Sequence, residues 1–133
     1  MGYVIDTTLL IAAERGYVDI KTNVKKHFNS PCFLSVIGVS ELLHGVRRAD
    51  DPAIRAHRSA FVEEILQKLP ILPIDVATAR IHAQLWADLA AKGVMIGAHD
   101  AWIAASCLAH GHTVITANIR EFDRVPGLSV ENW

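Results

Sequence analysis

The chain has 133 residues, of which 51% are hydrophobic and 20% are charged. This length fits one compact domain spanning 1–133, and the apolar content excludes an intrinsically disordered chain. The net charge of −1 excludes a uniformly basic nucleic-acid-binding protein, so any contact with phosphates must come from a local basic patch.

Short apolar runs alternate with longer segments of helical periodicity. In chain order, the first predicted elements are a strand over Tyr3–Asp6, a helix from Thr7 to about Arg15, a strand over Cys32–Ser35 and a helix from Val36 to about Ala49. A helix from Asp51 that ends at Pro70 follows, then a strand over Ile71–Ile74 and a helix capped by Asp75 that runs to about Lys92. The last elements are a helix over Ala98–His110, a strand over Thr113–Thr116 and an edge strand over Leu128–Val130. This alternation predicts an α/β fold, with a small parallel sheet of four to five strands flanked by helices.

The sequence shows no signal for export or for a membrane. The N-terminus lacks the basic segment of a secretory signal, and Asp6 interrupts its apolar start. Every unbroken apolar run is far shorter than the ~20 residues of a membrane span. Cys32 and Cys107 lack the spacing of a zinc site, which predicts buried, reduced thiols. We therefore expect a soluble cytoplasmic protein.

Three carboxylates stand where predicted strands end or helices begin. Asp6 ends the first strand, Glu41 lies in the first turns of the next long helix, and Asp100 lies in the first turn of the helix before the fourth strand. In open parallel sheets these positions meet at one edge, so we predict that the three acids converge. Taken alone, Glu41 or Asp100 also fits a structural role at a helix start, whereas Asp6 at the end of a buried strand needs a partner or a ligand.

Clustered carboxylates disfavour each other's ionised form unless a cation compensates their charge. Hard oxygen ligands suit Mg²⁺ or Mn²⁺, and such an ion can activate water and stabilise the charge that builds on a phosphodiester being cut. From the residues alone, a metal-dependent phosphodiesterase site is therefore a hypothesis.

Four segments resemble the motifs of PIN-domain proteins, and specifically of the VapC-type toxins of bacterial toxin–antitoxin pairs. They are VIDTTLLIAAERG at 4–16, SELLHG at 40–45, GAHDAWIAA at 97–105, and TANIREF at 116–122 followed by VPGL at 125–128. The segments occur in order and span nearly the whole chain, which makes the resemblance specific even though each motif alone is weak.

The resemblance implies a PIN-like fold and Mg²⁺- or Mn²⁺-dependent cleavage of structured RNA, commonly tRNA or rRNA. It also implies a homodimer and silencing by a cognate, VapB-like antitoxin. The family's acids fall on Asp6, Glu41 and Asp100 as metal-binding and catalytic residues, and Thr7 matches a hydroxyl residue that supports the first acid.

One position departs from the family pattern. Many PIN domains have a fourth acid where this chain has Asn118, and an amide adds no charge to a metal site. Glu121 is a candidate substitute if the segment is helical, because it lies three residues further on. One metal ion is therefore expected rather than two.

The candidate RNA-binding residues are arginines. Arg15 lies on the predicted helix that begins beside Asp6. Arg47 and Arg48 belong to a basic cluster with Arg55 and Arg58 that fits either a solvated face or a phosphate-binding flank.

Other residues near the motifs are assigned to the surface or the core. His44 is expected on the surface of its helix or beside the site. His99 is expected to point away from Asp100, as a sequence neighbour on a helix does. Trp102, Ile103 and Leu108 are expected in the core rather than in an RNA-stacking platform.

The leading hypothesis is thus a ribonuclease toxin. A housekeeping RNA-processing nuclease would use the same chemistry. The change at Asn118 leaves a third hypothesis, a catalytically impaired module that acts by forming complexes.

Overall fold

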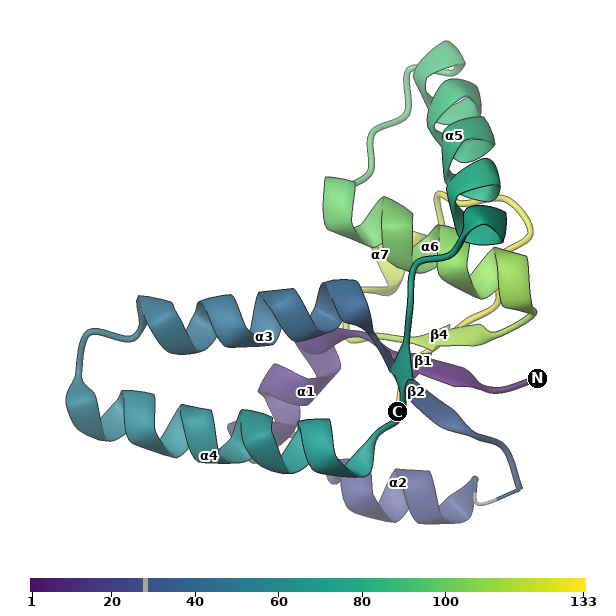
Figure 1. The fold of residues 1–133 in the computed structure, drawn as a ribbon. Helices are drawn as coiled ribbons and strands as arrows, with labels where there is room; N and C mark the ends of the chain where they lie inside the picture. The colour runs from purple at the N-terminus through teal and green to yellow at the C-terminus, as the bar shows by residue number, and fades with distance from the viewer. Residues whose placement is uncertain (28) are drawn as a thin grey trace.

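The computed structural model describes residues 1–27 and 29–133. Within them, five strands form one sheet in the order β3-β2-β1-β4-β5, and every neighbouring pair is parallel (Figure 1). The strands are β1 Tyr3–Ile5, β2 Cys32–Ser35, β3 Ile71–Leu72, β4 Thr113–Ile115 and β5 Val130–Glu131. The helices are α1 Thr7–Glu14, α2 Ile20–Lys26, α3 Val36–Arg48, α4 Pro52–Lys68, α5 Val76–Ala91, α6 Ala98–His110 and α7 Ile119–Phe122. The predicted α/β class and parallel sheet are confirmed.

Several strand ends differ from the prediction. Asp6 is not the last residue of β1 but the residue that precedes α1, and Thr116 lies beyond the end of β4. The third strand ends at Leu72, because Pro73 has no N–H to continue the ladder. The edge strand covers Val130–Glu131 instead of Leu128–Val130.

Two short helices, α2 and α7, were not predicted. Each has seven residues or fewer, which is too short for an apolar periodicity to be recognised. The signal for α2 was its cap: the side chain of Asp19 accepts a hydrogen bond from Thr22 N. The predicted cap of α5 is confirmed, since Asp75 accepts from Thr78 N at 2.8 Å.

The core lies on both faces of the sheet, because successive residues of a strand point to opposite sides. On one face Val4 and Val114 pack with Ile103 of α6. On the other face Ile5 and Ile115 pack with residues of α1, α3 and α4. Ile103 is confirmed as a core residue, Leu108 is partly buried against the same core, and Cys32 and Cys107 are buried free thiols. Burial raises the pKa of Cys107 to about 12.

Two helix pairs leave the sheet in different directions (Figure 1). The α3–α4 pair projects to one side as two adjacent helices, and α5 packs along α6 on the other side. The two pairs contact each other through α3 and α6, and the predicted acids lie at the start of these two helices and after the carboxyl end of β1. Among the described residues, no helix combines the length and the apolar character needed to cross a membrane.

Candidate active site

Asp6 is held at the carboxyl end of the central strand. Its backbone N–H continues the β1–β4 pairing by donating to Ile115 O at 2.8 Å, and the residue is only 2% exposed. Its carboxylate does not cap α1. Instead Oδ2 accepts hydrogen bonds from the hydroxyls of Thr8 at 2.6 Å and Thr116 at 2.8 Å. These two hydroxyls compensate part of the cost of burying a carboxylate.

Glu41 reaches the same region from α3. Its Oε1 accepts a hydrogen bond from the Thr7 hydroxyl at 3.4 Å, and Nδ1 of His99 lies 3.5 Å from its Oε2. Burial raises the pKa of Glu41, and the charge of Asp6 raises it further, whereas His99 and Thr7 act in the opposite direction. Asp6 and Glu41 therefore interact although they belong to different segments of the chain.

Asp100 completes the group from the first turn of α6. Burial raises its pKa to about 7, and the charges of Asp6, Glu41 and Glu121 add to that effect. The three predicted acids thus gather as expected, with a fourth carboxylate beside them. We call Asp6, Glu41, Asp100 and Glu121 the acidic cluster.

Glu121 belongs to α7, and its carboxylate is already engaged by the residue that precedes α6. Its Oε1 accepts a hydrogen bond from Gly97 N at 2.6 Å, and its Oε2 lies 3.3 Å from Nη1 of Arg124. A Cβ added to Gly97 would be in ordinary van der Waals contact, 3.4 Å from Oδ2 of Asp100 and 3.6 Å from Oε1 of Glu121, so both carboxylates lie beside the residue that precedes α6. Asn118 is exposed and precedes α7, and its backbone N–H donates to the Thr116 hydroxyl at 2.9 Å.

The donor chemistry fits a hard divalent cation, because carboxylates raise each other's pKa when no positive charge compensates them. Within residues 1–27 and 29–133, however, no three His, Cys, Asp or Glu side chains lie close enough to hold one ion together. Mg²⁺ commonly binds one or two carboxylates directly and keeps several waters, so it does not require three protein ligands. Asp6, Glu41 and Asp100 are the residues that would hold it, directly or through water.

Two expectations about neighbouring residues were wrong. The hydroxyl of Thr7 contacts Glu41 instead of Asp6, because the first residue of α1 faces α3. His99 does not point away from the site, since its imidazole lies beside Glu41.

Sequence reasoning also missed the roles of Thr8 and Thr116. The signal for Thr116 was the strand pairing: Ile5 pairs with Ile115, which brings the following residues of two adjacent strands together.

The predicted arginines lie away from the acidic cluster. Arg15 follows the last residue of α1, about 13 Å along the helix axis from Asp6. It does not pair with Glu14, whose carboxylate lies 3.6 Å from Arg58 Nε. Arg47 and Arg48 are exposed in the last turn of α3.

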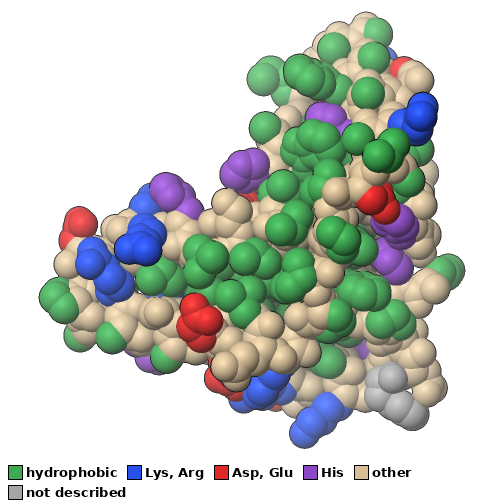
Figure 2. All heavy atoms as spheres, in the orientation of Figure 1, with side chains coloured by type: hydrophobic (Ala, Val, Ile, Leu, Met, Phe, Trp, Pro, Cys, Tyr) green, Lys and Arg blue, Asp and Glu red, His purple; other side chains and the backbone are tan. Residues whose placement is uncertain are grey.

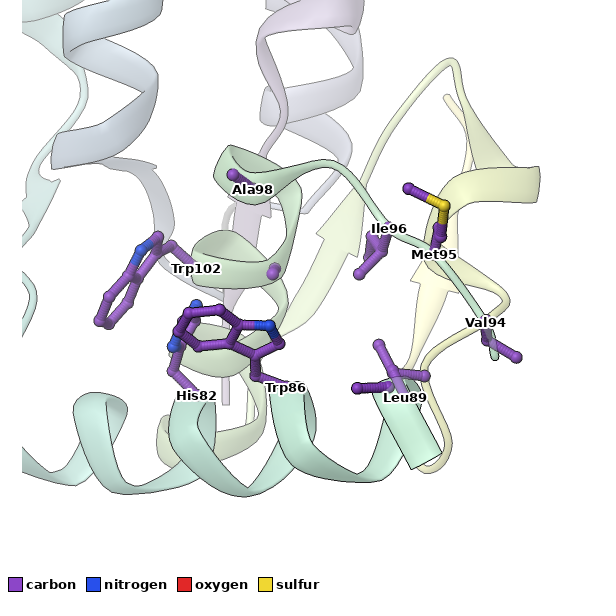
Figure 3. A pocket seen from close by; sticks show the side chains of 10 residues that line it. His82, Trp86, Leu89, Val94, Met95, Ile96, Ala98 and Trp102 are labelled. Carbon is purple, nitrogen blue, oxygen red and sulfur yellow. The ribbon is translucent and has the colours of Figure 1, made fainter. Parts of the chain in front are cut away.

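A pocket of about 440 Å³ lies between α5 and α6 (Figure 3). Trp102 is only partly buried there, since it lines the pocket, and its indole stacks on the imidazole of His82 with ring centroids 3.6 Å apart. Trp86 and Met95 line the same pocket and are 70% and 81% exposed. The pocket is therefore an apolar surface feature, and Trp102 is not a fully buried core residue.

Comparisons with known proteins agree with this architecture. The PIN domain family model matches residues 3–128. The chain is 36% identical over 130 residues to Ribonuclease VapC1 of Rickettsia felis, covering 98% of this chain and 95% of that protein. It is 33% identical over 114 residues to the tRNA(fMet)-specific endonuclease VapC of Salmonella typhimurium, covering 84% of each.

Solved structures match over the full length. VapBC2 from Rickettsia felis, bound to a DNA fragment from its promoter, has a TM-score of 0.89 at 28% identity, covering 100% of this chain and 99% of that chain. DNA-bound VapBC from Salmonella typhimurium has a TM-score of 0.88 at 29% identity, covering 100% and 98%.

Proposed function

The chain belongs to the PIN-domain family and, within it, to the VapC group, and on this basis we propose that it is a metal-dependent endoribonuclease toxin that cuts structured RNA. One observation carries the proposal. Carboxylates from four separate segments of the chain lie near enough to repel one another, and burial together with this repulsion raises the pKa of Asp100 to about 7. The carboxylates of such a cluster repel one another when they are ionised, and a bound cation offsets that repulsion.

A bound Mg²⁺ or Mn²⁺ ion would supply an activated water and offset the charge that builds on the phosphodiester. The protein's own part is to hold and orient the donors. Asp6 is fixed by two hydroxyls on its Oδ2, and Glu41 is placed by Thr7 and His99. Asp100 lies in the first turn of α6, where the partial positive charge of the helix N-terminus favours the ionised carboxylate.

The target is tRNA or rRNA, and a cognate, VapB-like antitoxin neutralises the toxin. A relative whose name specifies tRNA(fMet) supports the RNA class, and solved structures of VapBC complexes support the partner. The same toxin–antitoxin context favours a toxin over a housekeeping nuclease. The active protein is a homodimer. Supporting this, Val76, Trp86 and Met95 expose large apolar surfaces on α5 and the loop that follows it.

The test is RNA cleavage by purified protein from which any antitoxin has been removed. With Mg²⁺ or Mn²⁺ it should cut tRNA or rRNA, and EDTA or the cognate antitoxin should stop the reaction. Asp6→Asn and Asp100→Asn should each lower the rate at least about 100-fold, because each removes a donor charge.

Asp75→Asn is the matched control. It makes the same chemical change at another acid that follows a strand, and asparagine still caps a helix. Activity in Asp100→Asn equal to that of Asp75→Asn would refute the assignment. A wild-type protein that binds antitoxin but neither metal nor RNA would instead favour the catalytically impaired module that the change at Asn118 suggests.

A further inference from the structure

The outer half of α3 carries positive charge about 10 Å along the helix axis from Glu41 of the acidic cluster. Arg47 and Arg48 end the helix, and both are exposed. Within the described part of the chain, neither guanidinium has a carboxylate within the 4.0 Å of an ion pair. Figure 2 shows basic and histidine side chains gathered at the far end of the α3–α4 pair.

The other two arginines of this cluster are used structurally. Arg55 Nε donates to Ala49 O at 2.8 Å, and Arg58 Nη1 donates to Gly45 O at 3.2 Å. They therefore satisfy backbone carbonyls at the end of α3, which a helix terminus leaves without partners. Asp51, the nearby acid that starts α4, is likewise engaged, because its Oδ1 accepts the first backbone N–H groups of that helix. Arg47 and Arg48 remain as the cations available to a ligand.

Spacing connects Arg48 to the acidic cluster. Glu41, His44 and Arg48 are separated by three and four residues, so they share one side of α3. Glu41 and Arg48 are about 10 Å apart along the helix axis. His44 is exposed between them. A short stretch of nucleic-acid backbone lying along this side of α3 could therefore contact both Glu41 and Arg48.

We propose that His44 and Arg48, with Arg47 beside them, form a track on α3 that binds the phosphates of RNA next to the bond held at the acidic cluster. This inference rests on the proposed function and adds to it where the substrate lies. A chain with a net charge of −1 and four clustered carboxylates repels RNA at its own active site. Local cations must overcome that repulsion, and a guanidinium can bind a phosphate through two parallel hydrogen bonds.

The first test measures the affinity for fluorescein-labelled tRNA by anisotropy in EDTA, which prevents metal-dependent cleavage. Arg48→Gln should weaken binding about tenfold and lower the slope of log K against log salt concentration by about one unit, because one phosphate contact is lost. Arg80→Gln is the matched control, since Arg80 is an exposed arginine on α5. It should leave both quantities unchanged.

The second test follows cleavage of the same tRNA with Mg²⁺. Arg48→Gln should raise KM about tenfold and change kcat less than twofold, because the phosphates that it binds are not those being cut. His44→Gln should have a smaller effect in the same direction. Circular dichroism and thermal unfolding like those of the wild type would exclude misfolding of these surface variants.

The outcomes separate this inference from the proposed function. If wild-type protein cuts tRNA and Arg48→Gln behaves like Arg80→Gln, the track is refuted and the ribonuclease stands. The track is also refuted if Arg48→Gln loses affinity only for the antitoxin. If wild-type protein binds tRNA with the expected dependence on Arg48 but never cuts it, the track stands and the proposed function fails.

Discussion

Asp6 and Asp100 carry the same functional group in different surroundings. Asp6 is 2% exposed, and two hydroxyls donate to its carboxylate. Asp100 is partly buried among other carboxylates, and the pKa of its side chain is raised to about 7. Asp100 is therefore the member of the acidic cluster whose ionisation responds most directly to a cation.

This difference predicts how stability depends on pH. A carboxyl group whose folded-state pKa lies above its unfolded value binds its proton more tightly in the folded state, so its contribution to stability is present below pH 3.8 and is lost as the pH rises to about 7. In EDTA, the Tm of the wild type should therefore fall between pH 5 and pH 8, and that of Asp100→Asn should fall less. At pH 8 the variant should unfold a few degrees higher.

Differential scanning fluorimetry at several pH values measures both effects. Adding Mg²⁺ at pH 8 should raise the Tm of the wild type but not that of the variant, because binding to the folded state stabilises it. If the Tm of the two proteins changed in parallel with pH in EDTA, Asp100 would not be the carboxyl group with the raised pKa.

At the scale of elements, α7 and the start of α6 are tied together. Glu121 accepts from Gly97 N, and Arg124 donates both to Glu121 and to Met95 O at 2.8 Å. These contacts fix the loop that leads into α6, and hence the position of Asp100 in its first turn. Glu121 therefore positions the site, whether or not it also contacts a metal ion through water.

The matching substitution is Glu121→Gln. The amide oxygen can still accept from Gly97 N, so the free energy of unfolding should change by no more than about 0.5 kcal/mol. Mg²⁺ affinity measured by calorimetry should fall about tenfold, as for residues that orient metal ligands, whereas Asp100→Asn should abolish binding. Asp123→Asn, at an exposed acid next to the same helix, should change neither quantity. Loss of binding in Glu121→Gln as complete as in Asp100→Asn would instead make Glu121 a direct ligand.

At the scale of the whole molecule, two helix pairs leave the sheet in different directions, and the exposed large apolar residues of the α5–α6 pair are Val76, Ile81 and Trp86. Trp86 projects from α5 at the edge of a pocket that Trp102 also lines (Figure 3). An exposed tryptophan beside a hollow apolar surface is typical of a protein–protein interface. For the proposed homodimer, the partner would be a second copy of the chain on this face.

Light scattering after size exclusion tests the dimer directly. Wild-type protein at micromolar concentration should be dimeric, and Trp86→Glu should be monomeric, because it places a charge in a desolvated contact. Tyr17→Glu is the matched control, since Tyr17 is 79% exposed on a different part of the surface, and it should remain dimeric. A monomeric wild type, or a dimer unaffected by Trp86→Glu, would contradict the proposal.

Long helices were predictable because the spacing of their apolar residues repeats several times along the chain. α3, α4, α5 and α6 each have thirteen to seventeen residues, and all four were predicted from the sequence. The helices that were not predicted, α2 and α7, are too short for periodicity, and the strand ends at Ile5 and Leu72 depend on where neighbouring strands stop pairing.

The sequence by itself determined the α/β class, the parallel sheet and the convergence of Asp6, Glu41 and Asp100. These follow from local patterning and from the rule that parallel strands end at one edge. Only the tertiary structure decided that Thr8 and Thr116 hold Asp6, that His99 faces Glu41, and that Glu121 is bound to the start of α6. Apart from the local contact of Thr8 with Asp6, those contacts join residues up to 110 positions apart, and their geometry depends on how helices pack on the sheet rather than on spacing along the chain.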